Sequence, residues 1–316
     1  RKILCSQRAR ILLRKTRRNR LKNRKANITF HAMMAPGMIF ILIFNIIPLG
    51  GLMMAFQNFL PAKGLLGSKW VGLDNFKFMF QLPDSRQIFV NTLVIAVSKM
   101  LLNLLVPLVF ALMLNAVRCK LLKRTLQTIV YLPNFISWVI LGSIIADIFS
   151  KSGIINTLLS SIGIEPIIFM GSNTWFRPIV VLSDVWKGFG YNSIIFLAAL
   201  AGIDPTLYEA SAIDGATKSK QLWYITLPSI VSTIVLVGTL SLGNVLNAGF
   251  DQIFNLYNPL VYRTGDIIDT YVYRMGLENA QFSLATAVGM MKSVISFVLI
   301  IISYKLAEKF ANYRIF

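Results

Sequence analysis

Two long apolar runs of this sequence contain polar and aromatic side chains of the kinds that bind sugars. In the later run, Asn244, Asn247 and Asp251 are spaced i, i+3 and i+7, which places them on one face of a helix. The earlier run carries a second set near its middle: Trp186, Tyr191 and Asn192. Because amides pair with hydroxyls and aromatic rings stack on sugar faces, both sets predict a substrate path. The alternative is that they hold helices together.

The segment that joins these two runs, residues 202–230, has helix signals of its own. Asp204 can cap a helix, and Pro205 suits the first helical position. The pair Asp214-Gly215 then predicts a helix stop, with the glycine in the left-handed conformation.

A second short helix is predicted after that turn. Thr217 or Ser219 can cap it, and Pro228 ends it just before the next apolar run. The predicted product is a helix, a tight turn and a second helix that lie along one face of a membrane. The alternative is a simple amphipathic helix at the membrane interface.

The composition predicts an integral membrane protein. Of its 316 residues, 55% are hydrophobic and 14% are charged, whereas a soluble domain carries about 25% charged residues. A helix needs about 20 apolar residues to cross the hydrocarbon, and a barrel would show short alternating strands instead. Six runs have the required length: 33–56, 89–117, 125–149, 178–201, 229–250 and 282–306. The predicted fold is therefore all-α with six transmembrane helices, and 33–316 forms the membrane domain.

Basic residues predict which side of the membrane holds the chain ends. The net charge is +19, and the residues before 26 contain twelve of the 32 Lys and Arg and no acid. The links after the second and fourth runs are also basic, whereas the opposite loops have mixed charge. The positive-inside rule then predicts a cytoplasmic tail, 1–32, and two cytoplasmic termini. A nucleic-acid-binding arm is the alternative for the tail, but no base-reading module accompanies it.

The sequence lacks the residues or motifs that a disulfide framework, a metal cluster or a catalytic site would need. Cys5 and Cys119 both fall in segments predicted to be cytoplasmic, so we expect no disulfide framework. The single histidine, His31, excludes a His-based metal cluster, and neither a P-loop nor a nucleophile motif occurs. We therefore expect neither an enzyme nor a cofactor. The first run has spanning length, which predicts a retained anchor rather than a cleaved signal peptide.

Five charged residues lie inside the predicted spans or at their ends, where charge is costly and often functional. They are Lys99, Asp147, Asp184, Lys187 and Lys292. Asp184 and Lys187 are spaced i, i+3 and could pair with each other. A lysine that faces a cavity would suit an acidic sugar.

The loop 202–228 resembles the signature segment of type I ABC importer permeases. The matching residues are Glu209-Ala210-Ser211, then three residues, Gly215, nine residues, Ile225, one residue and Leu227-Pro228. The longer run EASAIDGATKSKQLWYITLP is similar to the carbohydrate-uptake branch that includes the maltose permeases, and WVGLDNFKFMF matches an outer segment of such subunits. The basic tail and short length are most similar to the lipoprotein-partnered polysaccharide permeases. Two differences are mild: Ser211 replaces a more frequent Ala, and Leu222 a frequent Phe.

The resemblance implies that 202–228 contains a cytoplasmic coupling helix that docks on an ATPase subunit. Glu209 would face basic groups of that subunit, and Gly215 would allow the close turn. The other positions implied in coupling are Ala210, Ser211, Asp214, Ala216, Ile225, Leu227 and Pro228. Closure of the ATPase dimer over ATP would switch the spans from inward-open to outward-open.

The resemblance also implies a complete assembly in a bacterial cytoplasmic membrane. A second, non-identical permease is expected, with a homodimer as the alternative. Two ATP-binding subunits would use ATP and Mg, and an extracytoplasmic solute-binding protein would deliver an oligosaccharide. Two rival classes are an ion-coupled secondary transporter, which commonly shows internal repeats, and a membrane enzyme, which needs convergent catalytic groups. Neither pattern occurs in this sequence.

Overall fold

The computed structural model describes residues 29–243 and 245–311. In these residues, four helices are long and apolar enough to span a membrane: Thr29–Phe56, Pro83–Ala116, Lys218–Gly243 and Phe282–Lys305. Two bent pairs raise the number to six if each pair is one span: Lys120–Phe135 with Trp138–Ile148, and Phe176–Ala201 with Pro205–Ile213. The predicted all-helical membrane fold is confirmed. Most of the predicted basic tail, 1–32, lies outside the described residues.

Short elements connect the long helices. The first half contains η1 (Leu42–Ile46), η2 (Ile47–Phe56), β1 (Gln57–Asn58), η3 (Pro61–Lys63), α2 (Gly64–Gly67), β2 (Lys69–Trp70), α3 (Asp74–Gln81), α4 (Pro83–Ala116), α5 (Lys120–Tyr131), η4 (Leu132–Phe135) and α6 (Trp138–Ile148). The second half contains α7 (Ile154–Ser161), η5 (Phe169–Gly171), α8 (Phe176–Ala201), α9 (Pro205–Ile213), α10 (Lys218–Gln221), η6 (Leu222–Thr226), α11 (Leu227–Gly243), α12 (Phe250–Leu256), η7 (Pro259–Val261), α13 (Tyr262–Gly265), α14 (Ile268–Tyr273), η8 (Arg274–Glu278) and α15 (Phe282–Ala311). The strands form one antiparallel pair, with Gln57 opposite Trp70.

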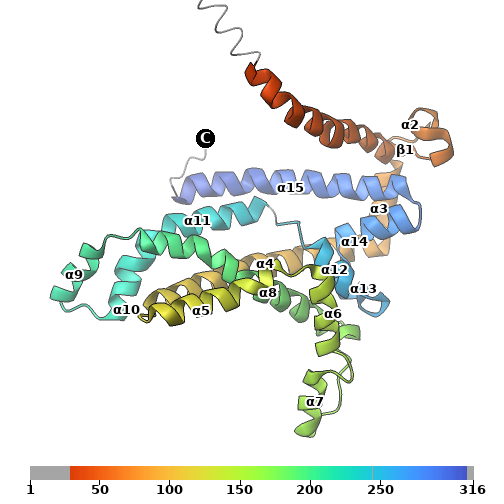
Figure 1. Cartoon of the computed structure of the whole chain (residues 1–316). Helices are drawn as coiled ribbons and strands as arrows, with labels where there is room; N and C mark the ends of the chain where they lie inside the picture. The colour runs from red at the N-terminus through yellow and green to blue at the C-terminus, as the bar shows by residue number, and fades with distance from the viewer. Residues whose placement is uncertain (1–28, 244, 312–316) are drawn as a thin grey trace, which may run out of the picture.

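The long helices run side by side, with α9 and α10 at one end and α13, α14 and β1 at the other (Figure 1). Helices α4 and α8 pack along each other, and α15 packs on α11 and η2. The main core lies where α4, α6, α8 and α12 meet, around Ile95, Leu141, Phe176 and Ile253. The short helix α12 is therefore packed among the spans rather than lying on their surface.

The third predicted span is not one straight helix. The chain bends by 102° between η4 and α6, where Ile136 and Ser137 are extended. Ser137 caps α6 by accepting a hydrogen bond from the Ile140 amide at 3.4 Å. Pro133 and Asn134 precede the bend as local turn signals, but hydropathy averaged over a run of spanning length does not detect it.

The prediction that Pro228 ends a helix is wrong, because the helix continues from Lys218 to Gly243. A π-helical turn, η6, precedes the proline, and the Leu227 amide donates to the Leu222 carbonyl. The first span accommodates Pro48 in the same way, with the amide of Ile47 donating to the carbonyl of Leu42. The wider turn accommodates a residue that has no N–H of its own.

The fifth span ends earlier than predicted. Helix α11 stops at Gly243 and α12 begins at Phe250, and residues 245–249 between them are not helical. Gly249 has φ +91°, a left-handed conformation that favours glycine. The prediction that Asn247 and Asp251 lie on one helical face is therefore wrong. Asn244, the third residue of that prediction, lies outside the described residues.

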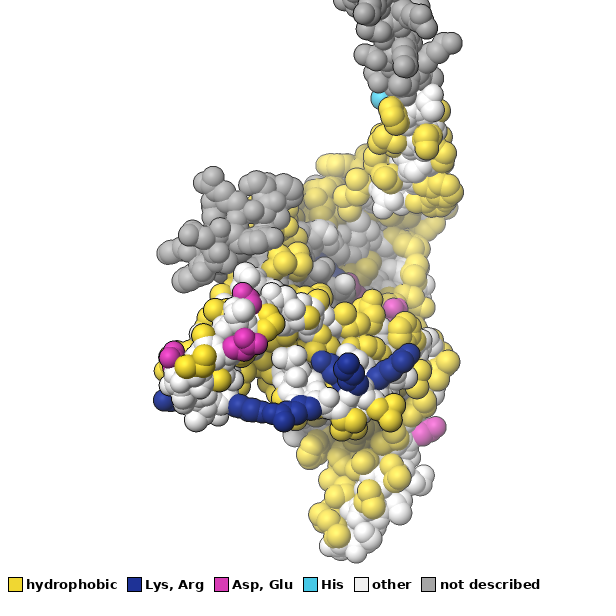
Figure 2. Space-filling view, turned by 60° about the vertical axis from the view of Figure 1, so that its left-hand side comes forward, with side chains coloured by type: hydrophobic (Ala, Val, Ile, Leu, Met, Phe, Trp, Pro, Cys, Tyr) yellow, Lys and Arg dark blue, Asp and Glu magenta, His cyan; other side chains and the backbone are white. Residues whose placement is uncertain are grey.

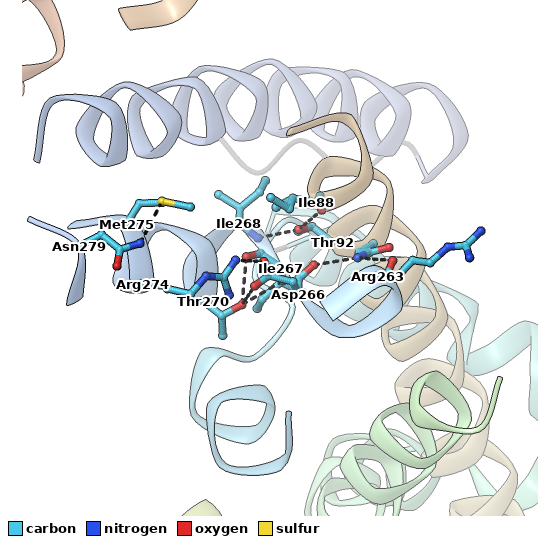
Figure 3. A network of polar contacts seen from close by, with 11 residues as sticks. Ile88, Thr92, Arg263, Asp266, Ile267, Ile268, Thr270, Arg274, Met275 and Asn279 are labelled. Atoms are coloured by element: carbon cyan, nitrogen blue, oxygen red, sulfur yellow. Dashed lines mark hydrogen bonds and ion pairs between the residues drawn. The ribbon is translucent and has the colours of Figure 1, made fainter. Parts of the chain in front are cut away.

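A polar network fixes the segment after α12 to α4 (Figure 3). The Asn91 amide donates to the carbonyls of Arg263 and Asp266 at 3.2 and 3.0 Å, and the Ile268 amide donates to Thr92 Oγ1 at 2.9 Å. Asp266 also accepts from Thr270 Oγ1 at 2.8 Å and pairs with Arg274. This network positions α14, which borders the polar pocket described below.

Candidate functional site

Helix α9 begins and ends at the residues that the sequence analysis identified. Asp204 Oδ1 accepts a hydrogen bond from the Thr206 amide at 2.9 Å, and this bond lowers the pKa of Asp204. The cap is therefore fully formed at neutral pH and is lost only as the pH falls through this lowered pKa. At the other end, the amides of Ala216 and Gly215 donate to Ser211 O and Ala212 O at 2.9 and 3.1 Å. This is a Schellman motif with Gly215 in the left-handed conformation, at φ +73°.

Side-chain hydrogen bonds hold α9 against the start of the following helix. Gln221 Nε2 donates to the Tyr208 carbonyl at 3.2 Å and to Ser211 Oγ at 2.8 Å. The Tyr208 hydroxyl lies 2.9 Å from Thr226 Oγ1. We call these four residues, Tyr208, Ser211, Gln221 and Thr226, the α9 brace. The brace gives Ser211 a partner that alanine at this position would lack.

The motif residues divide into an exposed face and a packed face. Glu209, Ala210, Asp214, Gly215 and Pro228 are exposed, whereas Ser211, Ala216, Ile225 and Leu227 are half-buried. The neighbouring Ile213 is 88% exposed. Figure 2 looks toward this end of the molecule and shows acidic, basic and apolar side chains close together there. A fixed helix with an exposed apolar residue beside acids is suited to docking on another protein.

The residues predicted to form a sugar path do not converge within this chain. Trp186 lines an apolar cavity of about 710 Å³ between α6, α7 and α8. Tyr191 lies edge to face with Phe135. Asn192 and Asp251 are exposed.

Asn247 borders a different cavity, a polar pocket of about 460 Å³. We define the polar pocket by its lining residues: Gly243, Leu246, Asn247, Phe250, Asp269, Lys292 and Ser296.

A buried charge network joins three segments and was missed by the sequence analysis. Lys99 Nζ, on α4, lies 3.3 Å from Asp184 Oδ1 on α8 and donates to the Ala248 carbonyl at 2.7 Å. Lys99 also donates to Gln252 Oε1, and Asn103 Nδ2 donates to Asp184 at 2.9 Å. The sequence does show opposite charges, Lys99 and Asp184, in two different spans. Whether they pair depends on how the spans pack, which the sequence alone does not reveal.

The structure also settles the partners of Asp184 and Lys187 and the exposure of Asp147. Asp184 pairs with Lys99 rather than with Lys187, contrary to the pairing considered from the i, i+3 spacing. Lys187 Nζ donates to the Asn134 carbonyl at 2.6 Å and lies over the Trp138 ring. Asp147 is exposed.

The family described as "Binding-protein-dependent transport system inner membrane component" matches residues 103–312, more than half of the chain. Two proteins of Bacillus subtilis (strain 168) are similar over nearly all of it. "Protein LplB" is 41% identical over 90% of this chain and 90% of its own length. The polygalacturonan/rhamnogalacturonan transport system permease protein YteP is 39% identical over 97% of this chain and 96% of its own length.

A solved structure is also similar. It is a chain of a bacterial ABC transporter involved in the import of the acidic polysaccharide alginate, with a TM-score of 0.85 and 38% identity. The match covers 92% of this chain and 98% of that chain. A chain of a bacterial alginate ABC transporter in complex with an alginate pentasaccharide-bound periplasmic protein matches with a TM-score of 0.83.

Proposed function

Because this chain belongs to the binding-protein-dependent transport system inner membrane components, we propose that it forms one half of the membrane path of an oligosaccharide importer. ATP hydrolysis in two partner subunits drives the import, and an extracytoplasmic binding protein delivers the sugar. The main support for the proposal is helix α9, which is exposed at one end of the bundle and contains the coupling motif. Asp204 caps its start, and Gly215 in the left-handed conformation ends it. An ion-coupled transporter has no evident use for such a helix.

The substrate class is proposed from the relatives. YteP is named for polygalacturonan and rhamnogalacturonan, and the similar structure imports the acidic polysaccharide alginate. An acidic oligosaccharide is therefore the proposed substrate. The open arrangement of Trp186, Tyr191, Asn192 and Asn247 supports a path that a second permease closes, because these side chains do not meet within one chain.

The proposed orientation places α9 in the cytoplasm. Its exposed face would dock on an ATPase subunit, with Glu209 toward basic groups and Ile213 in an apolar depression. Both chain termini are then cytoplasmic, in agreement with the basic links and tail. The ATP and Mg belong to the partner subunits.

The test is ATPase activity of this chain purified with its co-expressed partners. Binding protein loaded with an acidic oligosaccharide is expected to stimulate ATP hydrolysis several-fold over unloaded binding protein. If no ATPase co-purifies and uptake persists after ATP depletion, the proposal fails and an ion-coupled transporter takes its place.

The α9 brace yields a second prediction. Gln221→Leu removes two hydrogen bonds, each worth about 0.5–1.5 kcal/mol, so α9 should lose its fixed angle to the following helix. We expect the sugar imported per ATP hydrolysed to fall about fivefold or more. Ser219→Ala changes an exposed residue of the same helix and should leave this ratio unchanged. Equal ratios in the two variants would show that the brace plays no part in coupling.

A further inference from the structure

The polar pocket combines the groups that recognise an acidic sugar. Asn247 supplies an amide, Ser296 a hydroxyl and Phe250 an aromatic ring, while Asp269 and Lys292 supply a carboxylate and an ammonium group. These residues come from four parts of the chain: the turn before α12, the start of α12, α14 and α15. Of the residues that line this pocket, the sequence analysis named Asn247 as a path residue and Lys292 as a charged residue of a span. It could not bring them together, because their contact depends on the fold.

The pocket lies at considerable depth in the membrane. Lys292 follows the start of α15 at Phe282 by about ten residues, which is about 15 Å at 1.5 Å per residue. The hydrocarbon is about 30 Å thick, so Lys292 lies near its middle. Charged side chains at this depth are costly and usually functional.

Residues 245–249, beside the pocket, are not helical, since α11 stops at Gly243 and α12 starts at Phe250. Irregular backbone at membrane depth is tolerated only where protein covers it or where it lines a cavity. Both conditions are met here. Lys99 donates to the Ala248 carbonyl from the core side, and Leu246, Asn247 and Phe250 line the pocket on the other side.

Lys292 and Asp269 form an ion pair on the pocket wall. Lys292 Nζ lies 2.5 and 2.7 Å from the two carboxylate oxygens of Asp269. The side chains are 20% and 25% exposed, so the pair is accessible from the pocket. An ammonium group has three N–H donors, and within residues 29–243 and 245–311 no hydrogen-bond partner other than Asp269 is found for Lys292.

The other two span lysines, Lys99 and Lys187, bind partners outside the polar pocket. Lys99 is 6% exposed and held by Asp184, Gln252 and a backbone carbonyl, so it cannot meet a substrate in this conformation. Lys187 donates to the Asn134 carbonyl and does not border the polar pocket. Among the spans that the structure describes, Lys292 is therefore the lysine that lines this pocket.

We propose that Lys292 determines the specificity of the path for acidic sugars, by donating its third N–H to a sugar carboxylate while Asp269 remains its resident counter-ion. This inference rests on the proposed function. A lone ammonium group at this depth would hold an anion too firmly, whereas Asp269 offsets part of its charge. The pair therefore allows a carboxylate to bind and then to leave, as transport requires.

The test uses the complete transporter, reconstituted in vesicles with its binding protein, and measures uptake of oligogalacturonate and of its neutral methyl ester. The double variant Lys292→Gln/Asp269→Asn removes both charges and leaves none unpaired. Uptake of the acidic sugar should fall at least tenfold relative to wild type, while uptake of the neutral sugar changes less than threefold. Because every variant shares one binding protein, a changed acidic-to-neutral ratio reports the permease.

A single variant adds a readout that a purely structural ion pair would not move. Asp269→Asn leaves the Lys292 charge without its counter-ion, so KM for the acidic sugar should fall at least threefold and kcat should fall with it. Ser293→Ala, an exposed change on the same helix, is the control and should change neither.

Two outcomes would overturn the inference. One is an acidic-to-neutral uptake ratio that is unchanged in the double variant, whether both uptakes fall equally or neither falls. The other is a wild type that imports the neutral sugar alone. Failure of the wild type with both sugars, without ATPase stimulation, would instead overturn the proposed function itself.

Discussion

Replacement of Gly215 by valine is expected to reduce ATP-driven sugar uptake at least tenfold. Gly215 has φ +73°, and a Cβ added there would meet no atom within 4 Å. The expected defect is therefore one of backbone conformation rather than of space. A β-branched residue in the left-handed region is strained by about 1–3 kcal/mol. Because the Schellman bonds to Ser211 and Ala212 depend on this conformation, the turn should relax and move α9 away from its docking angle.

Asparagine provides the matched control, because it is enriched in the left-handed conformation. Gly215→Asn should retain most of the uptake, with equal amounts of both variants in the membrane. Aspartate is tolerated for the same reason, so Gly215→Asp would test added charge rather than backbone strain. The measurement is ATP-driven sugar uptake, together with ATPase stimulation by loaded binding protein, compared at equal protein level. Similar activity of the Val and Asn variants would show that the left-handed turn is not needed for coupling.

The ends of α9 could be predicted from sequence because their signals are local. Asp204, Pro205 and Gly215 act within a few residues of themselves, and each has its expected role as cap, first turn or left-handed stop. The long apolar runs were predicted for a similar reason, since spanning length is a property of composition. Only their ends and interruptions differ from the prediction.

The interruptions could not be predicted because apolar composition does not record backbone direction. The bend at Ile136 and Ser137 lies inside a run whose average hydropathy suits a single span, although Pro133 and Asn134 precede it. Pro228 was expected to end a helix, but a π-helical turn satisfies the backbone before it. A proline can therefore end a helix or be accommodated within it, and the outcome depends on whether the preceding turn can widen.

The pairing of Lys292 with Asp269 in the polar pocket could not be predicted for a different reason. Asp269 was expected in an outer loop, yet it pairs with Lys292 inside a span. Their separation in sequence is large, and their contact depends on α14 being held on α4 by Asn91 and Thr92. Long-range partners of this kind require knowledge of the packing.

The second large effect is expected from Lys99→Met, which should strongly reduce the amount of folded protein in the membrane. The change leaves the Asp184 carboxylate without its counter-ion and removes the donor to Ala248 O and Gln252 Oε1. Removal of one partner from a buried ion pair destabilises by about 3–5 kcal/mol, and Asp184 is 25% exposed, which favours the lower end. The measurement is the yield of monodisperse protein and its midpoint of thermal unfolding.

A charge-balanced variant separates the loss of the pair from the loss of packing. Lys99→Met/Asp184→Asn leaves no unpaired charge, so it should unfold at a clearly higher temperature than Lys99→Met alone. Lys187→Met is the comparison for a span lysine whose Nζ donates to a backbone carbonyl rather than to a carboxylate, and its effect should be smaller. If the double variant were no more stable than the single one, the pair would not be what stabilises the junction of α4, α8 and α12. The broken backbone before α12 would then depend on core packing around Ile253 rather than on Lys99.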